Sequence, residues 1–263
     1  MIVINSSDEM ISFVQDKLYE QLKEIDRICV ENNIKYSLAG GTFLGAIRHN
    51  GFIPWDDDAD VLMERSEFEK FQNIMMNSKS SSKYKLIRGS WSYRISEDIN
   101  VQYKEQIIEL ITTDVFVYDK VPLSNLLYTL QIIILKTLQG MLKKREYMSW
   151  KNKSILQNIA QSATFALGLL FSREIKIKCF DYISQIFNNN TIYKEFFAGN
   201  DDYKDMDKAI PRTLFETITT HKFRDSSFMI LGNYDYYLTK WYGDYMKLPP
   251  KELQKPTRRI DIN

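Results

Sequence analysis

Histidine and cysteine are scarce in this chain, which has two of each among its 263 residues. A zinc site with four His or Cys ligands would need all four of these residues despite their scattered spacing, so we do not expect one. Cys29 lies in a helical pattern and Cys179 stands next to Phe180, and we expect both to be small buried residues rather than nucleophiles or disulfide partners. Unpaired cysteines fit a reducing cytoplasm.

The chain also lacks the motifs and the charge bias of several common protein classes. It contains no Gly-x-Ser-x-Gly elbow and no Gly-Lys-Ser/Thr phosphate loop, which argues against an esterase-like triad and a P-loop kinase. The 35 Lys and Arg residues nearly balance the 34 Asp and Glu residues, and a net charge of +1 gives no electrostatic case for nucleic acid as a partner. The start, MIVINSSDEMISF, has no basic region before a long apolar stretch, so we expect no signal peptide and a cytoplasmic location.

Long hydrophobic runs are missing as well. Residues 126–135 and 163–171 are largely apolar, but both fall short of the roughly 20 residues that span a bilayer. We therefore expect core helices there rather than transmembrane helices. The alternative is peripheral contact with the inner face of the cell membrane, in which nearby lysines would meet an anionic leaflet. These lysines are Lys136, Lys143, Lys144, Lys151 and Lys153.

Strand and helix patterns alternate up to about residue 121, and helix patterns dominate after it. Ser6 and Glu9 are spaced as a capping box for a helix over residues 7–31. The apolar stripe of this helix consists of Ile11, Val14, Leu18, Leu22, Ile25 and Ile28. Further helices are predicted near residues 124–148, 153–171 and 173–188. The sequence therefore predicts an α/β (α+β) fold, in which a mixed sheet with packed helices is followed by a largely helical C-terminal part.

A dense acid cluster ends the segment GGTFLGAIRHNGFIPWDDDAD, residues 40–60. Asp58 and Asp60 come just before an apolar run that indicates a strand entering the core. Side chains two apart on a strand share a face, so these residues would lie roughly 6 to 7 Å apart at their Cα atoms. Two carboxylates at about 6 Å repel by about 3 kcal/mol at an effective dielectric constant near 20. A shared Mg²⁺ or Mn²⁺ removes this conflict; the alternative is a solvated acidic loop.

A turn of small residues precedes the acid cluster. A strand-like run over residues 35–39 ends at Gly40, Gly41 and Thr42, and a helical pattern follows. Glycines allow backbone conformations that aim successive N–H groups at one point, and a helix N-terminus adds positive potential, so phosphate is a natural occupant. Thr42 would cap the helix or donate a hydrogen bond to the phosphate.

Arg48, His49 and Trp55 lie between the turn and the acids. Arg48 could bind a phosphate with two hydrogen bonds, and His49 could reach a ribose, a phosphate or an acceptor hydroxyl. Trp55 is expected to be a hydrophobic anchor for the loop, and stacking on a base or sugar is the alternative. Near the C-terminus, the run NYDYYLTKWY at residues 233–242 predicts a capped aromatic helix, whose rings could line a sugar or choline pocket.

Residues 36–71, and again YGDYMKLPP at residues 242–250, resemble the LicD-type phosphotransferases, a family related to fukutin and fukutin-related protein that has a nucleotidyltransferase fold. The resemblance implies that the glycine turn holds the donor phosphates and that Asp58 and Asp60 bind the metal. A third acid of this family comes from a later strand, for which Asp114 is the best match and Asp119 is taken as the end of the strand.

The same resemblance extends to the Arg-His pair at residues 48 and 49, and it implies that this pair contacts the donor substrate. It implies a nucleotidyltransferase-like catalytic core over residues 1–121. Residues 122–263 would complete the same domain or form an acceptor-binding subdomain.

The activity implied is metal-dependent transfer of phosphocholine, or of a related phosphoalcohol, from CDP-choline to a hydroxyl of a cell-surface glycan, with release of CMP. Lipopolysaccharide, teichoic acid and capsule are such glycans, and relatives act on glycans built on lipid carriers. Three alternatives stay open: another CDP-alcohol donor such as CDP-ribitol or CDP-glycerol, nucleotidyl transfer to a small molecule or sugar, and a non-catalytic nucleotide- or glycan-binding protein.

Overall fold

The computed structural model describes residues 2–77, 83–104, 106–143 and 154–256. The chain divides into two compact units. The first comprises Met1–Ile87, Tyr93–Val117 and Thr213–Asn263, and the second comprises Arg88–Ser92 and Tyr118–Arg212. The predicted division between residues 121 and 122 stays a prediction, whereas the predicted mixed α/β fold is confirmed.

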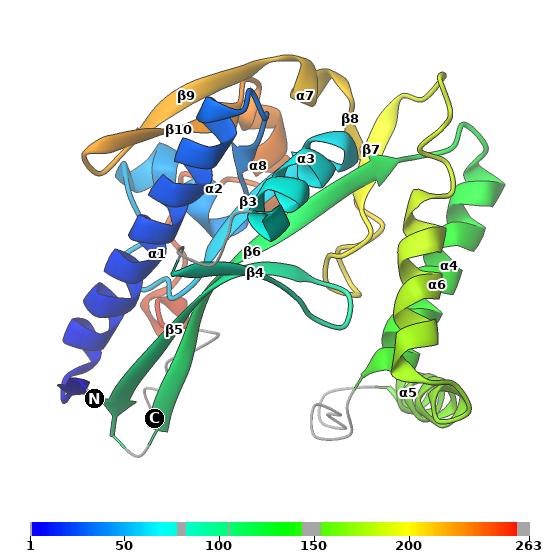
Figure 1. The fold of residues 1–263 in the computed structure, drawn as a ribbon, viewed down its shortest axis with the longest axis horizontal. Coiled ribbons are helices and arrows are strands. Elements are labelled where there is room, and N and C mark those ends of the chain that lie inside the picture. The colour runs from blue at the N-terminus through cyan, green and yellow to red at the C-terminus, as the bar shows by residue number, and fades with distance from the viewer. Residues whose placement is uncertain (1, 78–82, 105, 144–153, 257–263) are drawn as a thin grey trace. The chain divides into compact units, whose positions relative to one another are not determined.

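A mixed sheet carries most of the strands (Figure 1). Up to residue 120 these are β1 (Ile2–Ile4), β2 (Ser37–Leu38), β3 (Ala59–Glu64), β4 (Tyr84–Arg88), β5 (Tyr93–Tyr103) and β6 (Gln106–Lys120). The strand order is β1-β5-β6-β3-β2, with β4 also paired to β5. β1 runs parallel to β5, whereas β5 with β6 and β2 with β3 are antiparallel pairs. Strand β3, which contains Asp60, therefore lies between β6 and β2.

Among the described residues, the longer helices of the first unit are α1 (Ser7–Glu31), α2 (Gly40–His49), α3 (Arg65–Asn77) and α8 (Tyr234–Tyr242). The Ser6 half of the predicted capping box of α1 is confirmed, because Ser6 Oγ accepts a hydrogen bond from Glu9 N at 3.2 Å. Its predicted stripe is buried with one change: Met10 is fully buried, whereas Ile11 is only half-buried. The unit also contains the short helices α7 (Thr213–Glu216) and η2 (Lys251–Leu253).

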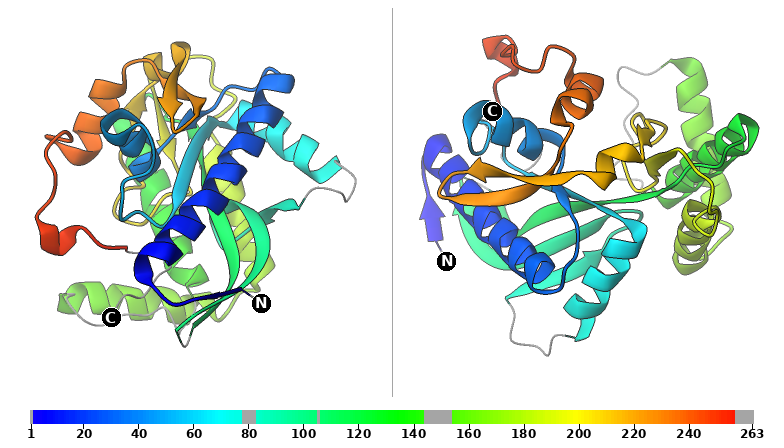
Figure 2. Two further views of the ribbon diagram at one scale, coloured as in Figure 1. Left: turned by 90° about the vertical axis from the view of Figure 1, so that its left-hand side faces the viewer. Right: turned by 90° about the horizontal axis from the view of Figure 1, so that it is seen from above.

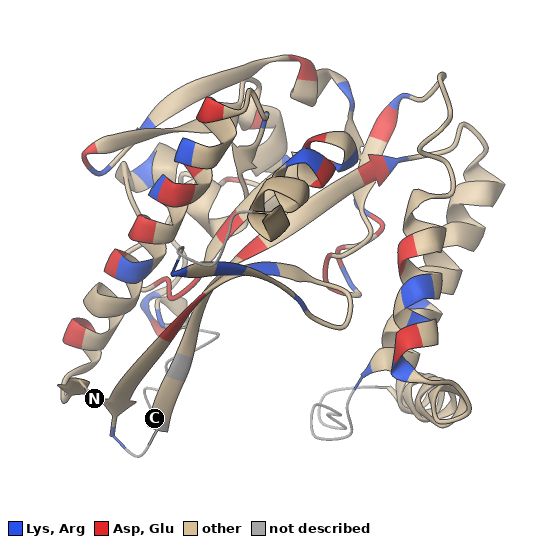
Figure 3. Ribbon diagram, viewed as in Figure 1, with Lys and Arg blue, Asp and Glu red and all other residues tan. Residues whose placement is uncertain are grey.

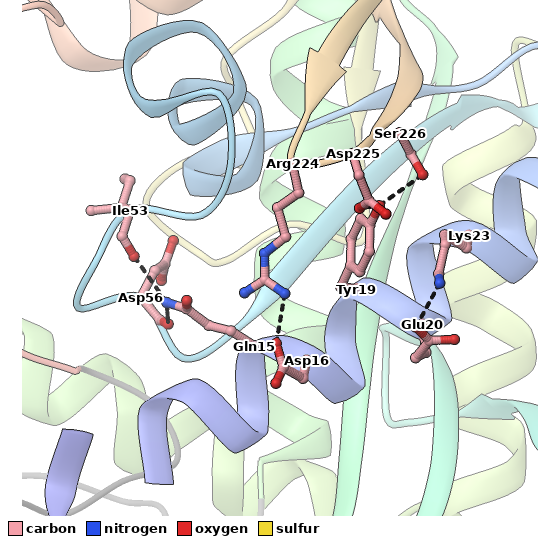
Figure 4. Close-up of polar contacts among 10 residues, drawn as sticks. All are labelled: Gln15, Asp16, Tyr19, Glu20, Lys23, Ile53, Asp56, Arg224, Asp225 and Ser226. Atoms are coloured by element: carbon pink, nitrogen blue, oxygen red, sulfur yellow. Dashed lines mark hydrogen bonds and ion pairs between the residues drawn. The ribbon is translucent and has the colours of Figure 1, made fainter. Parts of the chain in front are cut away.

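A two-stranded hairpin, β9 (Ile218–Phe223) and β10 (Ser226–Leu231), lies beside α1 (Figures 1 and 2). Figure 4 shows how its turn is attached to this helix. Tyr19 donates its hydroxyl hydrogen to Asp225 and forms a second hydrogen bond with the Ser226 hydroxyl at 2.7 Å, and Arg224 Nη1 donates to Asp16 Oδ1 at 2.6 Å. These polar contacts fix the hairpin against α1.

The second unit is built on three of the predicted helices, α4 (Asn125–Leu142), α5 (Ile155–Gly168) and α6 (Arg173–Gln185). Residues 144–148, at the end of the first predicted helix, fall outside the described residues. The strands β7 (Glu195–Ala198) and β8 (Ile210–Pro211), like β9 and β10, were not predicted. The core includes Leu135 of α4, Phe180 of α6 and Phe197 of β7.

The structure also bears on the predicted burial of the cysteines and on the prediction of no transmembrane helix. Cys179 was expected to be buried, but it is exposed on α6, whereas Cys29 in the first unit is buried as expected. Among the described residues, no single helix has both the length and the apolar character needed to cross a bilayer. The pair of α5 and α6, bent by 114°, passes that test by length and composition when taken together.

Candidate active site

Gly40 and Gly41, the first residues of α2, lie directly against two carboxylates. Gly40 has a φ of +51°, which L side chains rarely adopt, and a Cβ there would come within 2.3 Å of Asp60 Oδ2. A Cβ on Gly41 would come within 2.6 Å of Asp56 Oδ2. Only glycine lets the N-terminus of α2 approach the acids this closely. The structure thus brings the predicted turn and the predicted acids together.

Thr42 fastens α2 to the acid-bearing strand. Its hydroxyl oxygen accepts a hydrogen bond from Asp60 N at 2.9 Å, and Ala39 N donates to Asp60 O at 3.0 Å. Thr42 is fully buried, and the helix begins at Gly40 with Ala39 as its N-cap residue. The capping role considered for Thr42 is therefore wrong. Its hydroxyl supports the site by holding α2 against Asp60.

The acid cluster is almost completely buried, with exposures of 0%, 6% and 5% for Asp57, Asp58 and Asp60. Helix α1 holds the loop that leads to it. Gln15 Nε2 donates to the carbonyl oxygens of Ile53 at 3.0 Å and Asp56 at 2.9 Å (Figure 4). This one side chain bridges two carbonyl oxygens of the loop. Helix α1 therefore fixes the path of the chain just before β3 begins.

Helix α8 contributes aromatic residues to the site. The sequence predicted the helix but not which of its rings would lie there. Gly40 N donates to Tyr237 Oη at 3.4 Å. The Tyr237 ring stacks on Phe43 of α2 and on Trp241, with centroid distances of 5.4 and 4.6 Å. The predicted aromatic helix is confirmed, with Asn233 as its N-cap, and one of its rings, Tyr237, contacts the start of α2.

Tyr242, the last residue of α8, is close enough to the acids to be affected by their charge. Burial raises the pKa of its phenol well above the usual value, and Tyr237 and the carboxylates of Asp60, Asp56 and Asp58 raise it further. The residue as a whole is 41% exposed. Tyr242 therefore stays protonated at neutral pH and can donate a hydrogen bond within the site.

Arg48 and His49, at the C-terminal end of α2, contact each other and the chain after α8. Arg48 Nη1 donates to Tyr245 O at 2.8 Å, and Arg48 Nε donates to His49 Nε2 at 3.0 Å. The His49 ring lies edge-on to Trp55, with a centroid distance of 6.5 Å. Burial lowers the pKa of Arg48, and burial together with the Arg48 charge lowers the pKa of His49. His49 is thus a neutral ring that carries its proton on Nδ1.

Asp114 lies in β6, the strand next to β3, and is 7% exposed. Its Oδ1 accepts a hydrogen bond from Arg94 Nε at 2.7 Å, and the two residues face each other across β5 and β6. Asp119 belongs to the second unit, where its Oδ1 accepts from Asn188 Nδ2. The basic partner Arg94 was missed because its pairing depends on the register of two strands.

Comparison with known proteins bears on these positions. The family model described as LicD/FKTN/FKRP, nucleotidyltransferase domain, matches residues 33–157. A Haemophilus influenzae protein named lipopolysaccharide cholinephosphotransferase LicD is 31% identical over 255 residues, which covers 87% of this chain and 88% of that protein. The chain belongs to the LicD family. The resemblance inferred from the sequence is confirmed.

Two rickettsial relatives match shorter parts of this LicD-family chain. An uncharacterized protein of Rickettsia typhi is 42% identical over 62 residues, covering 24% of the chain and 20% of that protein. An uncharacterized protein of Rickettsia prowazekii is 31% identical over 112 residues, covering 40% of each. The stretch matched by the family model includes the glycine turn, the acids and Asp114, whereas α8 lies beyond it.

The donor set of this LicD-family site fits a hard divalent cation. Asp58 and Asp60 offer carboxylate oxygens, which Mg²⁺ prefers while it keeps several positions for water and substrate phosphate. Within the residues that the structure describes, no group of three or more His, Cys, Asp or Glu side chains is arranged to hold a metal ion. Asp58 and Asp60 would provide two ligands of such a metal, and oxygens of water and of the bound substrate would be others.

Proposed function

We propose that the chain transfers phosphocholine from CDP-choline to a hydroxyl of a cell-surface glycan of the lipopolysaccharide type and releases CMP. The observation that carries this proposal is the similarity, over 87% of the chain, to a protein named lipopolysaccharide cholinephosphotransferase. The close approach of Gly40 to Asp60 and of Gly41 to Asp56 supports it, because it brings a helix N-terminus to Asp60, one of the two acids that would bind the metal.

In this proposal the donor diphosphate lies at the start of α2. The N–H groups of the first turn of a helix have no partner within the helix, and they favour an anion. Asp58 and Asp60 would hold Mg²⁺ or Mn²⁺, which when bound neutralises diphosphate charge. Thr42 keeps the helix start and Asp60 in register through its hydrogen bond to Asp60 N.

The transfer breaks the bond between the phosphocholine phosphorus and the bridging oxygen, which leaves with CMP. The acceptor oxygen forms the new bond to phosphorus and loses its proton. Asp114 would either complete the metal shell or accept that proton, and its ion pair with Arg94 fixes the direction of its carboxylate. The protein's work is then positioning and charge stabilisation.

Arg48 and His49 would contact the donor from the other end of α2. The bond from Arg48 Nη1 to Tyr245 O orients the guanidinium, whose charge would offset that of the leaving CMP. Because His49 Nε2 accepts from Arg48 Nε, its Nδ1 carries the proton and would donate to a ribose or phosphate oxygen.

The test is product analysis with the full chain, Mg²⁺, lipopolysaccharide and, in turn, CDP-choline, CDP-ribitol, CDP-glycerol and CTP. We expect CMP and choline-modified glycan from CDP-choline, with turnover lowered at least about 100-fold in Asp58→Asn. Asp98→Asn is the matched control, since Asp98 is an exposed aspartate of β5, and it should keep full activity.

Other products would assign a different reaction to the chain. Pyrophosphate from CTP would indicate nucleotidyl transfer, and CMP from another CDP-alcohol alone would change the donor. Near-normal turnover in Asp58→Asn would remove the metal assignment. Binding of nucleotide without any product would favour a non-catalytic scaffold.

A further inference from the structure

Helix α5 of the second unit carries no charged residue. The uncharged run extends from Ser154 to Ser172, between Lys153 and Arg173, and Figure 3 shows α5 without a basic or acidic position. A surface helix of a water-soluble domain normally turns charged and polar side chains to the solvent. The composition of α5 already departs from that rule.

The orientation of α5 is also unlike that of an ordinary surface helix. Its less exposed positions follow a helical stripe of mostly polar or small residues, namely Asn158, Gln161, Thr164, Phe165 and Gly168. The opposite side, called here the outer face of α5, consists of Ile155, Leu156, Ile159, Ala163, Ala166 and Leu167. Ile155 and Leu156 are 79% and 78% exposed. The apolar side of the helix therefore faces outward and the polar side faces inward.

Close backbone contacts, rather than apolar packing, hold α5 in this orientation. A Cβ on Gly168 would lie 2.5 Å from Met141 O of α4, and one on Gly140 would lie 2.4 Å from Thr164 Oγ1. Lys176 Nζ of α6 donates to Met141 O at 3.1 Å and to Gly168 O at 2.8 Å. These contacts fix the inward stripe on α4, so the outer face is not available to the core of this unit.

The outer face continues into an apolar corner formed by Leu169, Leu170 and Phe171. Leu169 and Leu170 are 72% and 76% exposed. The backbone N–H groups of all three residues donate to carbonyls of the last turn of α5, at 3.1 to 3.4 Å. A segment whose N–H groups are already bonded can enter an apolar medium without leaving them unsatisfied.

We propose that the outer face of α5 and the apolar corner dock on an anionic lipid bilayer. Protein interfaces are enriched in Arg, Tyr and Trp and have polar rims, and the run from Ser154 to Ser172 contains none of these three residue types. Membrane-surface helices combine such an apolar side with basic neighbours. Here Arg173 follows the run directly, and residues 143–153 contain five Lys or Arg and one Glu.

The contact is with the surface of the bilayer. The 14 residues of α5 are about 21 Å long, short of the roughly 30 Å of a hydrocarbon core. Helix α6 begins with Arg173 and Glu174 and buries Phe180 in its own unit. Of the lysines considered from the sequence, Lys136 binds Asp207 Oδ1 at 3.1 Å, and residues 144, 151 and 153 lie outside the described part of the chain.

The test is co-sedimentation of the full chain with vesicles of phosphatidylcholine containing phosphatidylglycerol. The double variant Leu169→Ser/Leu170→Ser should bind at least about tenfold more weakly, because two leucines lose their apolar contact with lipid. The matched control is Leu110→Ser/Leu253→Ser, which changes two exposed leucines of the first unit and should bind as wild type does. Leu156→Ser, at the far end of the outer face, is the second variant and should also weaken binding.

Three results would overturn the proposal. The wild-type chain would stay in the supernatant with these vesicles, or both outer-face variants would bind as tightly as wild type. Alternatively, size-exclusion chromatography without lipid would show a dimer that the Leu169→Ser/Leu170→Ser variant loses, which would make a second copy the occupant. Because the assay contains no donor or acceptor, its outcome is independent of the proposed transfer reaction.

Discussion

At the scale of single residues, the glycines of α2 explain how several acids can be buried together. Asp60 and Asp56 approach the N-terminal end of the helix because Gly40 and Gly41 have no side chains in the way. Carboxylates near a helix N-terminus gain about 0.3 to 1 kcal/mol each, and more when partly buried. The N-terminus of α2 thus offsets part of the repulsion between the acids. The sequence had assigned that compensation to a bound metal alone.

His49 gives the first residue-scale prediction, which concerns stability against pH. Burial and the neighbouring Arg48 charge lower its pKa in the folded chain, and its Nε2 accepts from Arg48 Nε, which requires the neutral ring. As the pH falls below about 6.5, the unfolded chain takes up a proton that the folded chain refuses. The free energy of unfolding should therefore decrease below that pH.

Urea unfolding at pH 7.5 and pH 5.5 measures this effect. The loss of stability between the two values should be smaller in His49→Gln than in wild type, because glutamine has no proton to gain and can still accept from Arg48 Nε. Equal losses in the two proteins would contradict the assigned state of His49. All other titrating groups are common to both proteins and cancel in the comparison.

At the scale of elements, the contact between α4 and α5 yields the second prediction. By helix propensity alone, replacing a glycine that has helical backbone angles with alanine is favourable, by up to about 1 kcal/mol in a helix interior. At Gly168 the new Cβ would lie 2.5 Å from Met141 O and 2.9 Å from Met141 Cα, which are backbone atoms that cannot move without shifting α4. We expect Gly168→Ala to destabilise the chain by about 1 to 3 kcal/mol.

Thermal and urea unfolding would measure that change, with Ser162→Ala as the control on the exposed surface of the same helix. The control should change the free energy of unfolding by no more than about 0.5 kcal/mol. A Gly168→Ala variant as stable as wild type would show that α5 is not held to α4 by this close approach, and would weaken the orientation assigned to the outer face.

Elements with strong local signals could be predicted from the sequence. Helix α1 begins one residue after its Ser6 cap, and α4, α5 and α6 begin within three residues of the predicted positions. Strand β5 was missed because it buries the polar Ser96 and Glu97 and contains an irregularity between Asp98 and Val101. These features hide the alternation on which strand prediction depends.

The hairpin of β9 and β10 was missed for a different reason. Its turn has Arg224 at a φ of +56°, a conformation for which Gly or Asn is the usual sequence signal. Contacts to Asp16 and to Asn50 O stabilise it instead. A turn that depends on residues far away in the chain gives no local pattern.

The same distinction applies to the candidate site. The glycine turn and the acids lie within 21 consecutive residues, so their association could be predicted from local sequence. Tyr237 and Tyr242 approach Gly40 and Asp60 from about 180 to 200 residues away. Arg94 meets Asp114 through strand register. Their positions follow from tertiary packing, and the sequence could only indicate an aromatic helix without saying where its rings point.

At the scale of the whole molecule, each unit contains one cysteine, and the two differ sharply in environment. Cys29 on α1 is 0% exposed, and burial, followed by the charges of Asp26 and Glu67, raises the pKa of its thiol. Cys179 on α6 is exposed. Since the thiolate is the reactive form, alkylation should distinguish the two residues: Cys29 reports on opening of the first unit, and the exposed Cys179 serves as an internal reference.

We therefore predict that iodoacetamide at pH 8 modifies Cys179 promptly and Cys29 only as fast as the first unit opens. Peptide mass spectrometry follows each site, and Cys29→Ser and Cys179→Ser isolate one thiol at a time.

A ligand that binds only the folded first unit, at about 100 times its dissociation constant, lowers the open population about 100-fold. CDP-choline with Mg²⁺ should then slow modification of Cys29 by that factor in wild type but not in Asp58→Asn, while Cys179 reacts at an unchanged rate. Protection of Cys179 as well as Cys29 would contradict the assignment of the ligand site to the first unit, and equally fast modification of both without ligand would contradict the burial of Cys29.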